Sequence, residues 1–125
     1  MKLLGIDFGK SRIGISYSEG QIASPYSVIS IKNWGNKIKQ IVEKENIDKI
    51  IIGISEGEMA EKTKKFANEL SKISGKEIIL WDEALTTQDA IQKMISAGKS
   101  KKFRKEFQDA VAASLILQSY LDNNE

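Results

Sequence analysis

The sequence predicts an α/β fold in which helices cover both faces of a five-stranded mixed sheet. Three strand-like segments come first, at residues 2–8, 12–18 and 23–31. Helical and strand-like segments then alternate up to residue 81, and this alternation is typical of parallel strands joined by helical crossovers. A last helical segment follows a run of basic residues near the C-terminus.

The first three strands are predicted to form an antiparallel meander. The second of them places Ile13, Ile15 and Tyr17 at a period of two, and the short stretch FGKS supplies a turn before it. The third carries the chain's single proline, Pro25, near its start. Because proline donates no hydrogen bond to a sheet, it is confined to outer strands and strand ends. We therefore expect the third strand at an edge.

The middle of the chain predicts two crossovers from helix to strand. Residues 33–47 carry apolar side chains at helical spacing, and residues 48–55 contain a continuous apolar run, typical of a strand covered on both faces. The next helix is predicted to start with Ser55 as its N-cap, because Glu58 follows at capping-box spacing, and to stop at Gly75. The last strand follows directly, in KEIILW.

The final part of the chain predicts two more helices. Residues 86–98 fit a short helix, in which Thr86 and Asp89 stand at capping spacing. Residues 103–121 fit a long closing helix. No internal repeat, linker or low-complexity segment interrupts the chain, so we expect residues 1–125 to form one domain around one core.

Composition narrows the chemistry that is open to the chain. The sequence is 41% hydrophobic and 29% charged, as in an ordinary globular protein. It has no histidine and no cysteine, which excludes Ser-His-Asp triads, cysteine nucleophiles, disulfides and histidine or thiolate metal sites. Catalysis would have to depend on carboxylates, lysines, hydroxyls or oxygen-ligated ions such as Mg²⁺ and Mn²⁺.

The sequence gives no sign of a membrane segment or a secretion signal. No apolar run approaches the roughly 20 residues that cross a bilayer. The stretch MKLLGIDFG has an acid where a signal peptide has its apolar region. We therefore expect a cytoplasmic protein, with no membrane partner.

Acidic side chains at the ends of predicted elements are candidates for one site. Asp7 stands inside the apolar run of the first strand, and Asp82 and Glu83 follow the last strand. Open α/β sheets place their sites at such carboxyl ends. Asp109 shares a helical face with small and apolar residues three, four and seven positions later. Three acids that meet there could hold one or two divalent ions, which would activate water and bind a scissile phosphate.

Each of these acids also has a purely structural interpretation. Asp7 can shape the turn that follows the first strand. Asp82 and Glu83 can form a solvated pair at the start of the next helix. Asp109 can pair with Lys105, four residues earlier on the same helix.

A basic stretch, KSKKFRK, is a candidate phosphate-binding segment. Its cations are Lys99, Lys101, Lys102, Arg104 and Lys105. We expect Lys101, Lys102 and Arg104 to bind nucleic acid. We expect Lys10 and Arg12 at the rim of the acidic site, facing phosphodiester oxygens. The alternative for the basic stretch is a solvated face or the entry to the last helix.

Three separated motifs resemble those of the YqgF/RuvX family. GIDFGKSRIGIS resembles the family's opening motif, LWDEALTT its Asp-Glu-Arg-Leu-Thr-Thr segment, and QDAVAASLILQSYL its closing helix. They occur in the family's order and span nearly the whole chain. The resemblance implies a ribonuclease-H-like fold, related to Holliday-junction resolvases, and a bacterial cytoplasmic nuclease that matures the 5′ end of pre-16S ribosomal RNA.

The resemblance also implies site residues and partners. The family's acidic site, which would hold Mg²⁺ or Mn²⁺, falls on Asp7, Glu83 and Asp109. Further motif positions, where we expect contacts with nucleic acid, are Lys10, Arg12, Thr86 and Thr87. The implied substrates are pre-rRNA or branched DNA, and ribosomal precursor particles are the implied partners.

The chain departs from the family pattern in two places. The arginine that follows the family's Asp-Glu pair is Ala84 here, which removes a phosphate ligand. The segment after the buried strand, GISEGEMAEKT, is shorter than the family's loop and lacks its proline. Glu56 in that segment, or Asp82, could then take the place of Glu83.

Three functions follow from these observations as alternatives. The leading one is a metal-dependent phosphodiesterase that acts on structured RNA or on Holliday junctions. A binding module for RNA or the ribosome would use its acids only structurally. A nucleotide-binding lobe opens with a similar Asp-x-Gly hairpin, but 125 residues lack the second lobe that closes over the nucleotide. The oligomeric state stays open.

Overall fold

The computed structural model describes residues 1–85 and 108–124. Its strands are β1 (Leu3–Phe8), β2 (Arg12–Ser18), β3 (Ala23–Ser30), β4 (Lys49–Ile54) and β5 (Glu77–Asp82). Its helices are α1 (Trp34–Lys44), α2 (Met59–Ser74), the 3₁₀ turn η1 (Glu83–Leu85) and α5 (Gln108–Asn123). Within this part of the chain, no helix is both long and apolar enough to cross a membrane.

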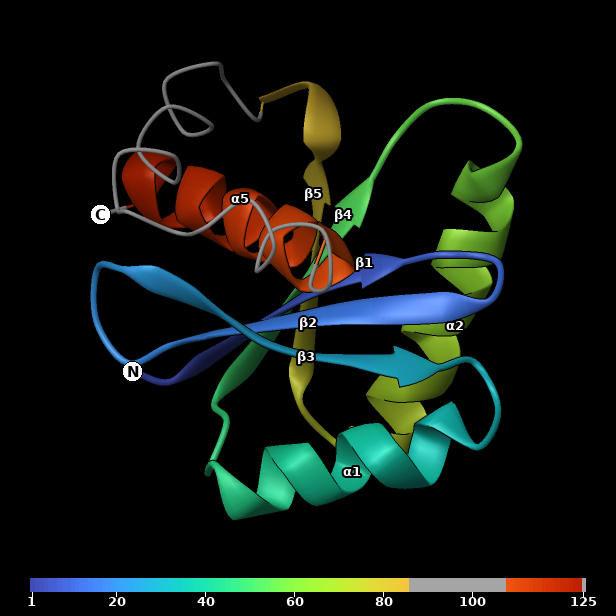
Figure 1. Cartoon of the computed structure of the whole chain (residues 1–125), viewed down its shortest axis with the longest axis horizontal. Coiled ribbons are helices and arrows are strands. Elements are labelled where there is room, and N and C mark those ends of the chain that lie inside the picture. Colours follow the sequence, from blue (N-terminus) through green and yellow to red (C-terminus); the bar gives the residue numbers. More distant parts are fainter. Residues whose placement is uncertain (86–107, 125) are drawn as a thin grey trace.

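The five strands form one mixed sheet in the order β3-β2-β1-β4-β5 (Figure 1). The first three strands pair antiparallel, and β4 pairs parallel with both β1 and β5. The predicted meander and mixed sheet are therefore confirmed, with β3 at an edge. The short helix predicted over residues 86–98 and the predicted start of the last helix at 103 lie outside the described residues.

Helices cover both faces of the sheet, as predicted. Side chains of a strand alternate between its two faces, so Leu4 and Ile6 of β1 pack in the larger core against α1 and α2. Leu3 of β1 and Ile51 of β4 point to the other face, where they pack in a smaller core with α5. The helix α5 packs on β1, β2 and β3, and Figure 1 shows it well apart from α1 and α2.

Three glycines allow α5 to lie directly on the sheet. A Cβ atom at Gly14 would collide with the carbonyl oxygen of Asp109, and one at Gly53 with the side chain of Ile116. Gly5, between them on β1, faces the backbone of α5. The missing side chains therefore bring the first turns of α5 against three adjacent strands.

The predicted start of the second helix is wrong. Ser55 is not an N-cap: α2 begins at Met59, with Glu58 at the N-cap position and no side-chain hydrogen bond there. The chain leaves β4 at Ile54 and turns through Gly57, whose φ of 116° suits glycine. The predicted stop is confirmed, because Gly75 has φ 68° and its N–H donates to the Ser71 carbonyl at 2.9 Å.

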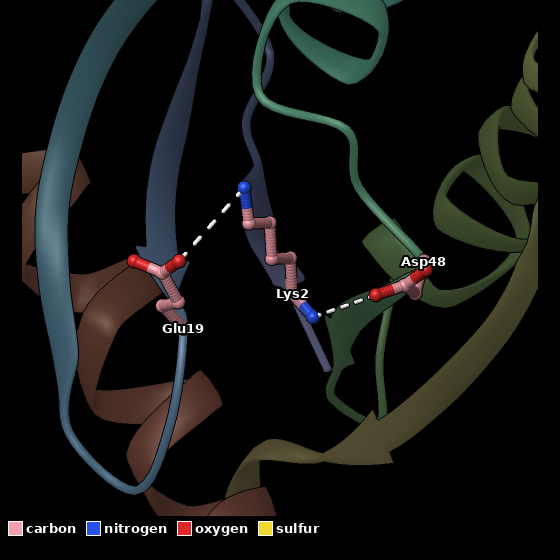
Figure 2. A network of polar contacts seen from close by, with 3 residues as sticks. All are labelled: Lys2, Glu19 and Asp48. Carbon is pink, nitrogen blue, oxygen red and sulfur yellow. Dashed lines mark hydrogen bonds and ion pairs between the residues drawn. The ribbon is translucent and has the colours of Figure 1, made fainter.

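Polar contacts join the chain segments at the end of the sheet where β1, β4 and β5 begin and β2 ends (Figure 2). We call it the amino end of the sheet. The backbone N–H of Lys2 donates to the Asp48 carboxylate at 2.8 Å, and the Lys2 ammonium lies 3.8 Å from the Glu19 carboxylate. Lys49 of β4 pairs in the same way with Glu77 of β5, at 3.6 Å. Acids at this end of the sheet therefore lie beside nitrogen donors.

Candidate active site

Asp7 lies near the carboxyl end of β1 on the face that α5 covers. It has the same parity along the strand as Leu3 and Gly5, which both contact α5 or its core. On β2 its partner in register is Gly14. The carboxylate is half-buried. The acid in this apolar strand therefore points to the sheet face on which α5 packs, and not to the turn after β1.

Glu83 reaches the same face from the end of β5. It opens the turn η1 directly after the strand, and Asp82 holds that turn by accepting a hydrogen bond from the backbone N–H of Ala84 at 2.9 Å. A Cβ atom at Gly53 would lie 3.0 Å from Glu83 Oε1. Glu83 therefore extends over β4 toward β1, whereas the carboxylate of Asp82 binds the backbone of the turn.

A hollow of about 200 Å³ lies between these two carboxylates and α5. Asp7 and Glu83 form its acidic wall. Its apolar wall consists of Ala112, Leu115 and Ile116 of α5. Two carboxylates from strands far apart in sequence thus face one recess that is large enough for ions, water or a phosphate oxygen.

Asp109 stands in the first turn of α5 and is held by an arginine. Its Oδ2 lies 2.9 Å from Nε of Arg12, at the start of β2. The Asp109 side chain is 30% exposed and that of Arg12 is 68% exposed. The negative charge of Asp109 acts on Asp7, but Arg12 already compensates that charge.

Burial and neighbouring negative charges disfavour the ionised forms of Asp7 and Glu83. Burial, followed by the negative charges of Glu83 and Asp109, raises the pKa of Asp7 from 3.8 to about 6. Burial, followed by the charge of Asp82, raises the pKa of Glu83 as well. Within residues 1–85 and 108–124, no lysine or arginine pairs with either carboxylate. A bound cation would relieve this repulsion.

The fit to a divalent ion is partial. Carboxylate oxygens are the ligands that Mg²⁺ and Mn²⁺ prefer, and Asp7 and Glu83 offer them in one recess. Yet among the described residues no three acidic side chains are grouped closely enough to hold a metal ion. The three-carboxylate site predicted from the sequence therefore stays a prediction, with Asp109 engaged by Arg12.

The remaining predicted residues fall into two groups. Lys10 is exposed in the turn between β1 and β2, and Glu56 is exposed between β4 and α2; neither lines the hollow. The other predicted nucleic-acid ligands lie outside the described residues; they are Thr86, Thr87, Lys101, Lys102 and Arg104. Lys105, the alternative partner of Asp109, lies there too.

The sequence interpretation missed two features of the site. Arg12 was expected at the rim of the site, facing phosphodiester oxygens, and its ion pair with Asp109 was not foreseen. Gly14 and Gly53 were not singled out, although they admit α5 and Glu83. Gly14 could have been found from the sequence, because pairing the two strands of the predicted hairpin places it opposite Asp7.

Comparison with known proteins assigns the family. The sequence profile of RuvX, described as Holliday junction resolvase, matches residues 1–123. The chain belongs to the RuvX family. The predicted family, and with it the enzyme class of a phosphodiester-cleaving nuclease, are thereby confirmed.

Relatives in the RuvX family match over nearly their whole length. A protein of Agathobacter rectalis named "Putative pre-16S rRNA nuclease" is 35% identical, and the match covers 98% of this chain and 95% of the relative. A Listeria monocytogenes protein of the same name is 36% identical, with 98% of both chains covered.

Solved structures share the fold at low sequence identity. Thermus thermophilus RuvC in complex with a Holliday junction substrate matches with a TM-score of 0.64 and 11% identity, over 99% of this chain and 96% of RuvC. The fowlpox virus Holliday junction resolvase gives a TM-score of 0.64 at 17% identity, over 98% and 99%. The predicted ribonuclease-H-like fold of this RuvX-family chain is confirmed.

Proposed function

We propose that this chain is a divalent-metal-dependent endonuclease for structured nucleic acid, with 5′-end processing of pre-16S rRNA as its reaction. One observation carries the proposal: Asp7 and Glu83 face one hollow without a cationic partner among the described residues. Perturbed carboxylates in a recess at the carboxyl end of a sheet are typical of a catalytic site. The names of the relatives supply the RNA substrate.

Asp7 and Glu83 are the residues that would hold the ion, and Asp109 would join them after release from Arg12. When bound, Mg²⁺ or Mn²⁺ supplies Lewis acidity and a more acidic water. The chain's own residues do the rest. Phosphates on either side of the scissile bond bind to Arg12, which is exposed and lies against Asp109, and to Lys10 in the exposed β1–β2 turn.

A Holliday junction is the second candidate substrate. The family's description and the RuvC fold favour it. Phosphate contacts are common to RNA and DNA, and only shape and 2′-hydroxyl contacts separate the two. For the RNA reaction we infer a cytoplasmic protein that meets ribosomal precursor particles.

The test compares cleavage by matched variants. Purified protein with Mg²⁺ or Mn²⁺ is incubated with a labelled pre-16S leader and with a four-way DNA junction. We expect Asp7→Asn and Glu83→Gln each to lower the rate by at least about a hundredfold. Glu56→Gln, which removes an exposed acid outside the hollow, is expected to leave the rate unchanged.

Each other outcome contradicts a defined part of the proposal. Equal cleavage by Asp7→Asn would remove the catalytic role of the hollow. A loss with Glu56→Gln alone would move the site to the β4–α2 segment. Tight RNA binding with no cleavage by any variant would favour the binding module.

A further inference from the structure

A second hollow, of about 220 Å³, lies at the same end of the sheet but on its other face. We call it the aromatic hollow. Its apolar lining comes from Phe8, Ile31, Trp34 and Phe66, and its charged lining from Lys62, Lys65 and Glu69. Phe8 follows Asp7 directly in β1, so its side chain points to the face opposite the acids.

The aromatic side chains of this hollow hold one another in place. Phe66 is buried, at 3% exposure, and its ring centroid lies 4.4 Å from that of Phe8 and 4.5 Å from that of Trp34. Phe8 and Trp34 remain partly exposed. A buried ring thus supports two partly exposed rings, which is a preformed surface for another planar group.

Positive charge borders the aromatic hollow. Lys62 and Lys65 are exposed on one face of α2, one turn apart, and Lys10 is exposed in the turn two residues after Phe8. Among the described residues none of these lysines forms an ion pair, and Glu69 is the one acid in the lining. The end of β1 contacts α2 through the rings of Phe8 and Phe66.

An aromatic floor with a basic border fits nucleic acid. Every base has a face that can stack on an aromatic ring, and lysines neutralise the phosphates on either side. Asp7 and Phe8 are consecutive residues at the carboxyl end of β1, the central strand, and their side chains point to opposite faces of the sheet. A nucleic-acid strand that passes over this end of the sheet can contact both hollows.

We propose that the aromatic hollow binds an unpaired base of the substrate strand, with Phe8 and Trp34 against the base and Lys62 and Lys65 on the flanking phosphates. This inference rests on the proposed function, since it supplies a single-strand contact beside the site of cleavage. The segment that the hollow accepts is therefore unpaired, next to structured nucleic acid.

The test measures binding without cleavage. It uses the Asp7→Asn protein in EDTA, with Trp81→Phe added, so that Trp34 is the remaining one of the chain's two tryptophans. We expect an unstructured RNA oligonucleotide to quench Trp34 fluorescence. In the Asp7→Asn protein with Trp81 intact, an anisotropy titration with labelled oligonucleotide should show affinity about tenfold lower for Trp34→Leu, the loss of one stacked base.

Paired lysine variants separate the hollow from general positive charge. Lys62→Ala with Lys65→Ala should reduce the slope of log affinity against log salt by about 1.4, as expected for two phosphate contacts on a single strand. Lys44→Ala with Lys72→Ala removes the same charge from the last turns of α1 and α2, and both lysines are exposed. This control should change the slope by less than half as much.

The outcomes distinguish this inference from the proposed function. Binding without quenching, with equal slopes for the two lysine pairs, overturns the aromatic hollow and leaves the cleavage result standing. Absence of both binding and cleavage in the parent protein overturns the proposed function. Quenching that depends on protein concentration, without RNA, identifies a contact between two copies and overturns the inference.

Discussion

At the amino end of the sheet acids lie beside nitrogen donors, whereas at the carboxyl end Asp7 and Glu83 have no cationic partner among the described residues. Glu19 and Glu77 pair with lysines at 3.8 and 3.6 Å. Burial raises the pKa of Asp7 and of Glu83, and the neighbouring negative charges raise both further. The same strands connect the two ends.

The difference between the two ends of the sheet shows which charged residues stabilise the fold. Exposed ion pairs such as those at the amino end contribute about 0.2–1 kcal/mol each. Half-buried acids that repel one another lower stability, and a chain retains them where function needs the charge. The carboxyl end is therefore interpreted as the site, and the amino end as ordinary surface.

The largest effect on stability is expected from a methyl group added where α5 contacts β2. In Gly14→Ala the new Cβ would meet the backbone carbonyl of Asp109, which cannot move without shifting α5. We expect the free energy of unfolding to fall by about 3 kcal/mol or more, as for overpacked cores. Urea denaturation measures this free energy.

The control is Gly20→Ala, in the β2–β3 turn at the amino end. The new Cβ there has open space around it, and the change in stability should be less than about 0.5 kcal/mol. Similar losses of stability in both variants would show that the close contact between Gly14 and α5 does not limit the size of the side chain there.

An intermediate, pH-dependent effect is expected from Asp7→Asn in the absence of divalent ions. The pKa of Asp7 is about 6 in the folded chain, above its ordinary value of 3.8, so the unfolded chain loses this proton first as pH rises. Stability of the parent protein should therefore fall between about pH 4 and 6 and stay lowered above that range.

The variant lacks this loss. Asp7→Asn should be more stable than the parent by about 1–3 kcal/mol at pH 7.5, and the gap should close near pH 4. Thermal denaturation across this pH range measures the gap. At the amino end Glu77→Gln, which breaks an exposed pair, should lower stability by less than about 1 kcal/mol. Equal stability of Asp7→Asn and the parent protein at pH 7.5 would show that the two ends of the sheet do not differ electrostatically.

The smallest effect is expected from Arg12→Gln, which frees the Asp109 carboxylate. If Arg12 competes with a divalent ion for Asp109, its loss should tighten Mn²⁺ binding by about two- to fivefold, the equivalent of one exposed ion pair. Calorimetry without nucleic acid measures it. Lys49→Gln frees Glu77 at the amino end and should leave Mn²⁺ affinity unchanged. An unchanged affinity in Arg12→Gln would mean that Asp109 is not a ligand.

Local pattern was sufficient for much of the fold. A period of two marked β2, a continuous apolar run marked the doubly covered β4, and Gly75 marked the end of α2. Local pattern failed at Ser55, where a capping-box spacing was present but the chain first had to turn through Gly57 before α2 could begin. Capping motifs describe a helix start only if the chain leaves the preceding strand there.

Residue order alone was enough to place the strand segments, to exclude histidine and cysteine chemistry, and to identify the acids that qualified for a site. The folded chain was needed to show that Glu83 faces the hollow while Asp82 holds the turn, and that Asp109 pairs with Arg12. The cause is the sequence separation of the residues that come into contact. Periodicity along the chain fixes the face on which a side chain lies, but its partner across that face comes from another element, here up to 97 positions away, as between Arg12 and Asp109.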